Sequence, residues 1–116
     1  YYTHQIPNFE EIGTLLNEFK GAPIGVWLDF GHAYVQGLWG LPGLDDYIQQ
    51  YDYAIKGIHL HDAKGSKDHL PPGQGDIHFE KHIQFLKKKV IILEINKRHS
   101  DGELQEGINI FNKIIQ

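Results

Sequence analysis

The chain has 116 residues, which suits one domain, and its 41% hydrophobic and 22% charged residues are those of an ordinary globular protein. The formal net charge is −4 and Arg98 is the only arginine, so the basic surface of a dedicated nucleic-acid-binding protein is absent. There is no cysteine, which excludes disulfides and thiolate metal sites and favours the cytoplasm. No apolar run approaches the roughly 20 residues that span a bilayer, so we expect no membrane contact.

The first half of the chain predicts two helices and one strand. Residues 9–19 carry apolar side chains at helical spacing behind Asn8, which is a suitable N-cap. The apolar run at residues 24–28 predicts a buried strand. Residues 34–43 are expected to form a loop that walls a pocket, and residues 44–51 predict a short helix.

The second half predicts two further strands, each followed by a helix. Residues 55–60 and 90–93 are the apolar runs that predict these strands. Residues 77–88 carry a helical pattern that ends in lysines, which suits the negative end of the helix dipole. Residues 104–115 are amphipathic and predict the last helix.

The order of these elements is a helix and then three strand–helix pairs. Strands about 30 residues apart with helices between them indicate right-handed crossovers and a parallel α/β sheet. The first helix has no strand in front of it, so the chain is expected to begin inside a βα unit.

A polar side chain stands at the carboxyl end of each predicted strand. Because side chains alternate between the two faces of a strand, Asp29, His59 and Glu94 are expected on the face turned away from the helices. Active sites of parallel α/β sheets lie at this end of the strands. Carboxylate and imidazole ligands suit Zn, Mn, Co or Mg, so the pattern predicts a divalent metal site.

Further candidate ligands lie in the loops after the strands. His32 follows Asp29 by three residues, and His69 comes shortly before Gly73 and Gly75, which let the backbone approach a ligand closely. The helix start expected near Asp76 is a candidate site for an anion. The other histidines are interpreted as ordinary buried or surface residues, namely His4, His61, His78, His82 and His99.

Four stretches of the chain resemble the xylose-isomerase-like TIM-barrel superfamily in order and spacing. They are residues 29–33 (DFGHA), 56–62 (KGIHLHD), 68–77 (DHLPPGQGDI) and 93–94 (LE). That superfamily contains sugar and sugar-phosphate isomerases and epimerases and the endonuclease IV class of AP endonucleases. The resemblance implies that residues 1–116 form a single partial domain, the C-terminal part of a (β/α)₈ barrel with about three βα units.

The resemblance also implies roles for particular residues. Asp29, His59 and Glu94 match metal ligands at the ends of the sixth, seventh and eighth strands, and a glutamate expected before Tyr1 completes the set. In the isomerases and epimerases the metal polarises a sugar carbonyl while two glutamates move the proton, which makes Glu94 the candidate catalytic residue. His32 and His69 match additional metal ligands of the three-zinc AP endonucleases.

One position departs from the endonuclease pattern. Lys67 stands where the resemblance places an aspartate, and the acidic residue is Asp68 instead. With the negative net charge, this favours a divalent-metal-dependent isomerase or epimerase acting on a small carbohydrate over a zinc AP endonuclease with a DNA partner. A non-catalytic barrel that binds metal or sugar is a third alternative.

Three strands cannot close a barrel, which takes roughly 250 residues. We therefore expect the 116-residue chain by itself to be inactive, or to associate with another copy across its open sheet edges.

Overall fold

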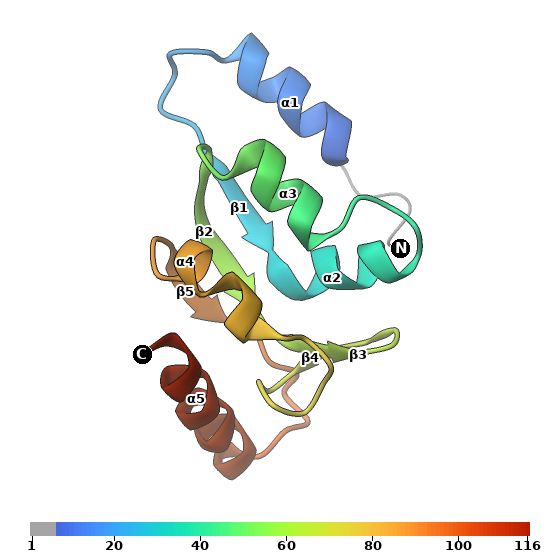
Figure 1. Ribbon diagram of the computed structural model, residues 1–116, viewed down its shortest axis with the longest axis vertical. Coiled ribbons are helices and arrows are strands. Elements are labelled where there is room, and N and C mark those ends of the chain that lie inside the picture. The colour runs from blue at the N-terminus through green and yellow to red at the C-terminus, as the bar shows by residue number, and fades with distance from the viewer. Residues whose placement is uncertain (1–6) are drawn as a thin grey trace.

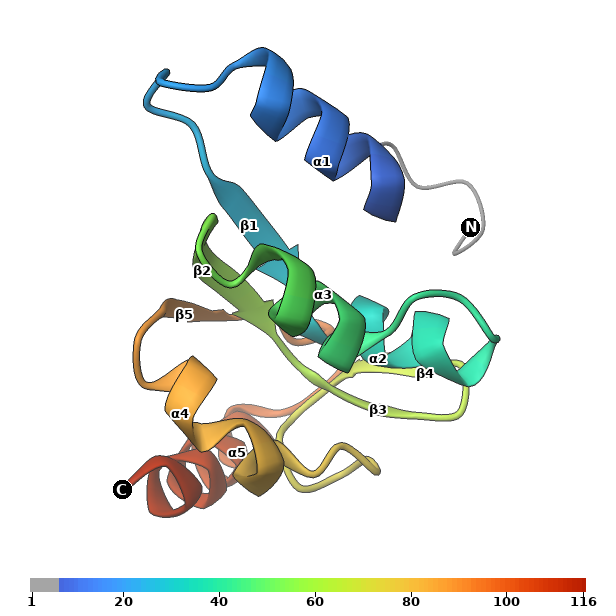
Figure 2. The ribbon, with the colours of Figure 1, turned by 45° about the horizontal axis from the view of Figure 1, so that its top comes forward.

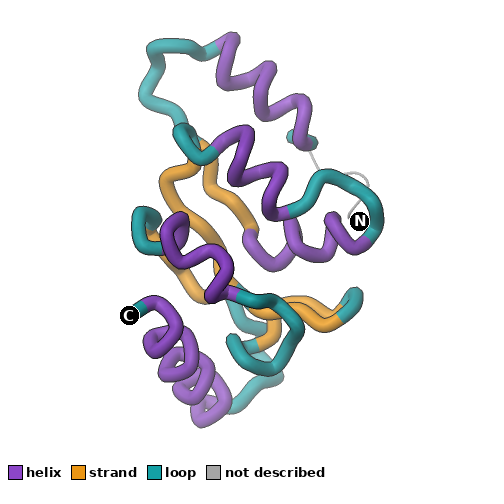
Figure 3. The backbone as a smooth tube through the Cα atoms, in the orientation of Figure 1, coloured by secondary structure: helices purple, strands orange, loops and turns teal. Residues whose placement is uncertain are grey.

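The computed structural model describes residues 7–116, so the interpretation of His4 lies outside the described residues. Strands β1 (Val26–Asp29), β2 (Ile55–Leu60) and β5 (Val90–Leu93) form a parallel sheet in the order β1-β2-β5 (Figure 1). The remaining elements are α1 (Phe9–Glu18), α2 (Phe30–Leu38), α3 (Leu44–Tyr51), β3 (Asp62–Lys64), β4 (Lys67–Leu70), the 3₁₀ turn η1 (Phe79–His82), α4 (Ile83–Leu86) and α5 (Asp101–Ile115). The alternation of strands and helices confirms the predicted α/β class (Figure 3). Within residues 7–116, no helix is both long and apolar enough to cross a membrane.

The two faces of the sheet have different surroundings. Leu28, Ile58 and Leu60 belong to the apolar core that the sheet shares with the helices of one side (Figure 2). On the opposite face, Trp27 and Ile92 are 45% and 48% exposed. Parallel sheets are normally covered on both faces, and in a barrel the second face lines the interior. The exposed face is therefore the one that corresponds to the barrel interior.

Helix α1 begins as the sequence predicts. Asn8 and Glu11 form a reciprocal capping box, in which each side chain accepts a hydrogen bond from the other residue's backbone N–H. The helix packs on α3 through Phe9, whose ring contacts those of Tyr47 and Tyr51. A groove of about 470 Å³ remains between α1 and β1.

The helix predicted at residues 77–88 is wrong in length. The structure has the turn η1 followed by the four-residue helix α4. The backbone N–H of Asp76 donates to the carbonyl of Ala63, and that of Ile77 donates to the Asp62 carboxylate. These bonds tie the segment to strand β3, so the chain turns helical only after it leaves this contact.

The loop predicted at residues 34–43 is also partly wrong, because its first half continues α2. This helix starts directly at the end of β1 and buries Phe30, Ala33 and Val35. Gly31 and Gly37 lower its intrinsic helix propensity, which hid the pattern in the sequence. Tertiary burial of the apolar side chains overrides that weakness.

The amino end of the sheet is held by a buried lysine. Nζ of Lys89 donates to the backbone carbonyls of Asp52, at 2.9 Å, and Ile55, at 2.7 Å, and pairs with the Asp52 carboxylate at 2.7 Å. One side chain thus joins the end of α3, the start of β2 and the start of β5.

We expect Lys89→Met to lower the free energy of unfolding by about 1–3 kcal/mol, since it leaves partly buried acceptors without a donor. Urea denaturation measures this change. The neighbouring Lys88→Met, at an exposed position, is the matched control and should shift stability by no more than about 0.5 kcal/mol. Equal stability of the two variants would contradict the role of Lys89.

Candidate metal centre

Asp29, His59 and Glu94 converge at the carboxyl ends of the three parallel strands. The strand register places Asp29 beside His59, and Glu94 follows directly after β5. Nδ1 of His59 lies 3.3 Å from a carboxylate oxygen of Glu94. One ligand atom from each of the three residues lies within 4.8 Å of the others. The sheet therefore brings together the three residues that the alternation pattern selected.

Asp29 combines two structural positions in one residue. It ends β1 and is the N-cap of α2, where its Oδ1 accepts the backbone N–H of His32 at 2.9 Å. Its carboxylate also contacts the imidazoles of His32, at 3.0 Å, and His61, at 2.9 Å. Burial by itself would raise the pKa of Asp29, but these hydrogen bonds outweigh it and hold the pKa well below its usual range. Asp29 is therefore ionised across the physiological pH range.

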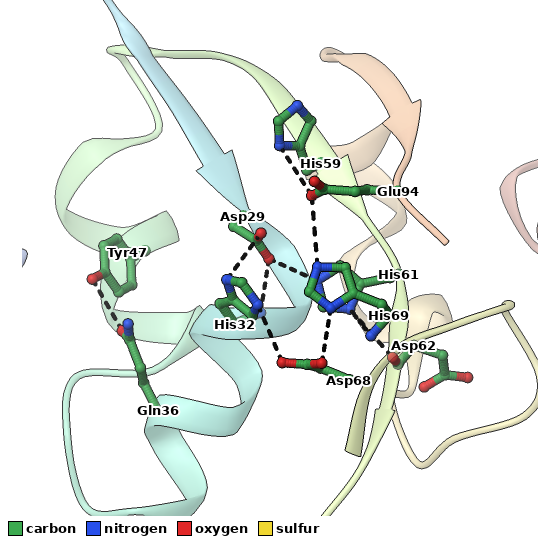
Figure 4. A network of polar contacts seen from close by, with 10 residues as sticks. All are labelled: Asp29, His32, Gln36, Tyr47, His59, His61, Asp62, Asp68, His69 and Glu94. Atoms are coloured by element: carbon green, nitrogen blue, oxygen red, sulfur yellow. Dashed lines mark hydrogen bonds and ion pairs between the residues drawn. The ribbon is translucent and has the colours of Figure 1, made fainter. Parts of the chain in front are cut away.

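His32 and His69 join the same cluster through Asp68 (Figure 4). Nε2 of His32 lies 3.2 Å from one Asp68 oxygen, and Nδ1 of His69 lies 2.8 Å from the other. Burial would lower the pKa of His32, but the adjacent carboxylates of Asp29, Asp68 and Glu94 raise it above its usual value. The acidic residue that the sequence shows displaced by one position thus still contacts both histidines.

The hairpin of β3 and β4 delivers Asp68 and His69 to the cluster. The two strands pair in antiparallel register, and the turn between them contains Gly65 at a positive φ of 58°. His69 itself has a φ of 56°, which is uncommon for a residue other than glycine. This hairpin was predicted only as a loop, because its strands are short and polar.

His61 is a member of the cluster that the sequence interpretation treated as an ordinary histidine. It is completely buried, and it lies with Asp29, His32 and His69 in a second group of potential ligand atoms. Gly31 makes room for it, because a Cβ at residue 31 would come within 2.0 Å of the His61 ring. The signal in the sequence is its position directly after β2 and two residues beyond His59, because alternate residues of an extended chain share a face.

Asp62 holds the loop that follows the hairpin. Its carboxylate is buried and accepts the backbone N–H groups of Ala63, Gly73, Gly75 and Ile77, at 2.8, 2.9, 2.9 and 3.0 Å. The group that the backbone of Gly73 and Gly75 approaches is therefore the protein's own carboxylate, which accepts both N–H groups. The anion site expected at a helix start near Asp76 is wrong, because the first helical turn begins only at Phe79 and the N–H of Ile77 donates to Asp62. Gly75 is required for this approach, because a Cβ there would lie 2.4 Å from the Asp62 carboxylate.

The donor set fits a divalent metal ion. Carboxylate oxygens and imidazole nitrogens suit Zn, Mn, Co or Mg. Among the described residues, His78, His82 and His99 belong to neither group of potential ligand atoms.

Comparison with family models places the chain in a known group. The model described as xylose isomerase-like TIM barrel matches residues 1–114. The chain therefore belongs to the xylose isomerase-like TIM-barrel family, which includes isomerases, epimerases and AP endonucleases and often uses divalent metals. Searches of curated proteins and of solved structures gave no match.

We expect Asp62→Asn to destabilise the protein by about 3 kcal/mol or more. The NH₂ group of asparagine would face backbone N–H groups whose hydrogen bonds are now accepted by a carboxylate oxygen. Chemical denaturation measures the change. Asp76→Asn alters an exposed carboxylate of the same loop and should stay within about 0.5 kcal/mol of the wild type. A small effect of Asp62→Asn would show that the loop does not depend on this carboxylate.

Proposed function

We propose that the chain forms part of a divalent-metal-dependent isomerase or epimerase acting on a small sugar or sugar phosphate, with the cytoplasm as its compartment. The observation that carries the proposal is the convergence of Asp29, His59 and Glu94 at the carboxyl ends of three adjacent strands. Family membership supports it, because the family is largely enzymatic. These three residues would hold the metal.

The proposed chemistry is proton transfer at the carbon beside a carbonyl. A bound divalent metal would polarise the substrate carbonyl and hydroxyl. One carboxylate takes the proton as the C–H bond breaks and its electron pair moves toward the carbonyl, and a second carboxylate returns a proton. Glu94 is the proposed member of this pair on the chain. It is suited to reach a substrate because its side chain is half-exposed and lies on the open face.

Glu94→Gln in the full-length protein should abolish exchange of the substrate C–H proton with solvent deuterium, since the amide cannot accept that proton. The assay uses free ketohexoses and pentulose phosphates with saturating Mn²⁺, followed by NMR. Glu80→Gln changes an exposed glutamate outside the cluster and should leave exchange unchanged. Full exchange by Glu94→Gln would contradict the role of Glu94. Sugar binding without turnover by the wild type would favour the non-catalytic barrel.

A second candidate function, a zinc AP endonuclease, is favoured by one specific contact. Asp68 reaches both His32 and His69, at 3.2 and 2.8 Å. The displaced aspartate thus supplies an acidic group to the histidines that match the additional zinc positions of AP endonucleases. Lys67 therefore counts less against an endonuclease, because the neighbouring Asp68 contacts both histidines. The net charge of −4 still opposes a DNA partner.

Metal stoichiometry separates the two functions. The isomerase or epimerase predicts no more than one tightly bound ion per full-length chain, in the wild type as in His32→Ala and His69→Ala. The endonuclease predicts two or three zinc ions, reduced by either substitution, together with cleavage of abasic DNA that weakens steeply with salt. Elemental analysis after dialysis measures the ions. More than one ion with DNA cleavage would overturn the isomerase assignment.

A further inference from the structure

We propose that His61 is a positioning residue, which holds the Asp29 carboxylate in place for the metal and is not itself a ligand. This inference rests on the metal centre of the proposed function. The structure puts His61 within reach of a shared ion with Asp29, His32 and His69. Its hydrogen bonds, however, assign it another role.

Both ring nitrogens of His61 already have partners. Nδ1 lies 2.9 Å from the backbone N of His69, and Nε2 lies 2.9 Å from Oδ1 of Asp29. Nδ1 also lies 3.3 Å from the backbone carbonyl of Asp62, but the shorter contact with His69 N–H decides its protonation, because two N–H groups cannot face each other at 2.9 Å. A backbone N–H can only donate, so Nδ1 must be the unprotonated acceptor. In the neutral ring the proton is then on Nε2, which donates it to Asp29. The hydrogen bonds thus fix one tautomer, and this tautomer leaves no lone pair for a metal.

The surroundings of the ring are built to keep this orientation. The His61 side chain is fully buried. Its ring stacks on that of His69 with centroids 4.2 Å apart and planes inclined by 15°. On another side, Gly31 leaves out the Cβ that would overlap the ring. The positive φ of His69 occurs at the residue whose N–H meets Nδ1, so an uncommon backbone conformation accompanies the contact.

The consequence falls on Asp29. Oδ1 of its carboxylate accepts hydrogen bonds from Nε2 of His61 and from the backbone N–H of His32. Oδ2 contacts Nδ1 of the His32 ring. Partners of this kind, which bind a metal ligand and not the metal, fix the orientation of the ligand and commonly change metal affinity 10- to 100-fold, an order-of-magnitude range. Losing the His61 donor therefore weakens metal binding through Asp29.

Two substitutions at residue 61 separate the two hydrogen bonds. His61→Gln places its amide near the position of Nε2 and keeps a donor for Asp29, whereas His61→Asn is shorter and keeps only a group near Nδ1. Calorimetric titration of the metal-free full-length protein with Mn²⁺ should show affinity about 10- to 100-fold lower for His61→Asn. The affinity of His61→Gln should stay within roughly three-fold of the wild type if the donor is what matters. His78→Asn, at an exposed position, should not change it.

A second variant tests the same role without removing the imidazole. Gly31→Ala should displace the His61 ring and lower Mn²⁺ affinity, while Gly102→Ala, where a Cβ meets only open space and a serine hydroxyl at 3.8 Å, should not. In the wild-type protein, ¹⁵N NMR should show His61 protonated on Nε2 and unprotonated on Nδ1.

Several outcomes would overturn the inference. Wild-type affinity in His61→Asn would show that the donor is not needed, and a lost ion in both residue-61 variants would make His61 a ligand. A proton on Nδ1 would contradict the assigned tautomer. Absence of Mn²⁺ binding by the wild type would remove the metal centre and this inference with it. Failure of the isomerase alone would appear only in the proton-exchange assay, with Mn²⁺ binding intact.

Discussion

The carboxylate of Asp29 connects the parts of this structure that the candidate site requires. It ends β1, caps α2 and contacts the rings of His32 and His61. The cap fixes where α2 begins, and the helix in turn places His32 one turn along, beside the carboxylate that caps it. Secondary structure and site geometry are therefore determined by the same contacts, and a change at Asp29 affects the helix start and the metal centre together.

A second carboxylate, Asp62, organises the other half of the site. It gathers backbone donors from the hairpin and from the loop that ends at Ile77. With that loop anchored, the hairpin reaches across to α2, where Asp68 meets His32. The Asp29 carboxylate thus lies at the candidate metal site, whereas the Asp62 carboxylate is occupied by hydrogen bonds from the protein's own backbone. Both come directly from a β-strand, and their different surroundings separate their roles.

The sequence predicted the parts of the fold that repeat with a simple period. Alternation along short apolar strands was enough to place Asp29, His59 and Glu94 on one face, and the sheet confirms that placement. The role of His61 depends on contacts between residues far apart in the chain, such as the space left by Gly31, and no local pattern encodes them. The α2 helix was missed for a related reason, since burial and an Asp29 cap outweigh two glycines.

The contact between Gly31 and His61 has a consequence for how this site can change over evolution. A Cβ at residue 31 would overlap the imidazole, so the two positions cannot enlarge independently. Relatives that carry a smaller side chain at residue 61 are free to carry a larger one at residue 31, whereas relatives with histidine at 61 should retain glycine at 31. Paired substitution at these two positions would then mark lineages in which the support of Asp29 has been rebuilt with a different residue.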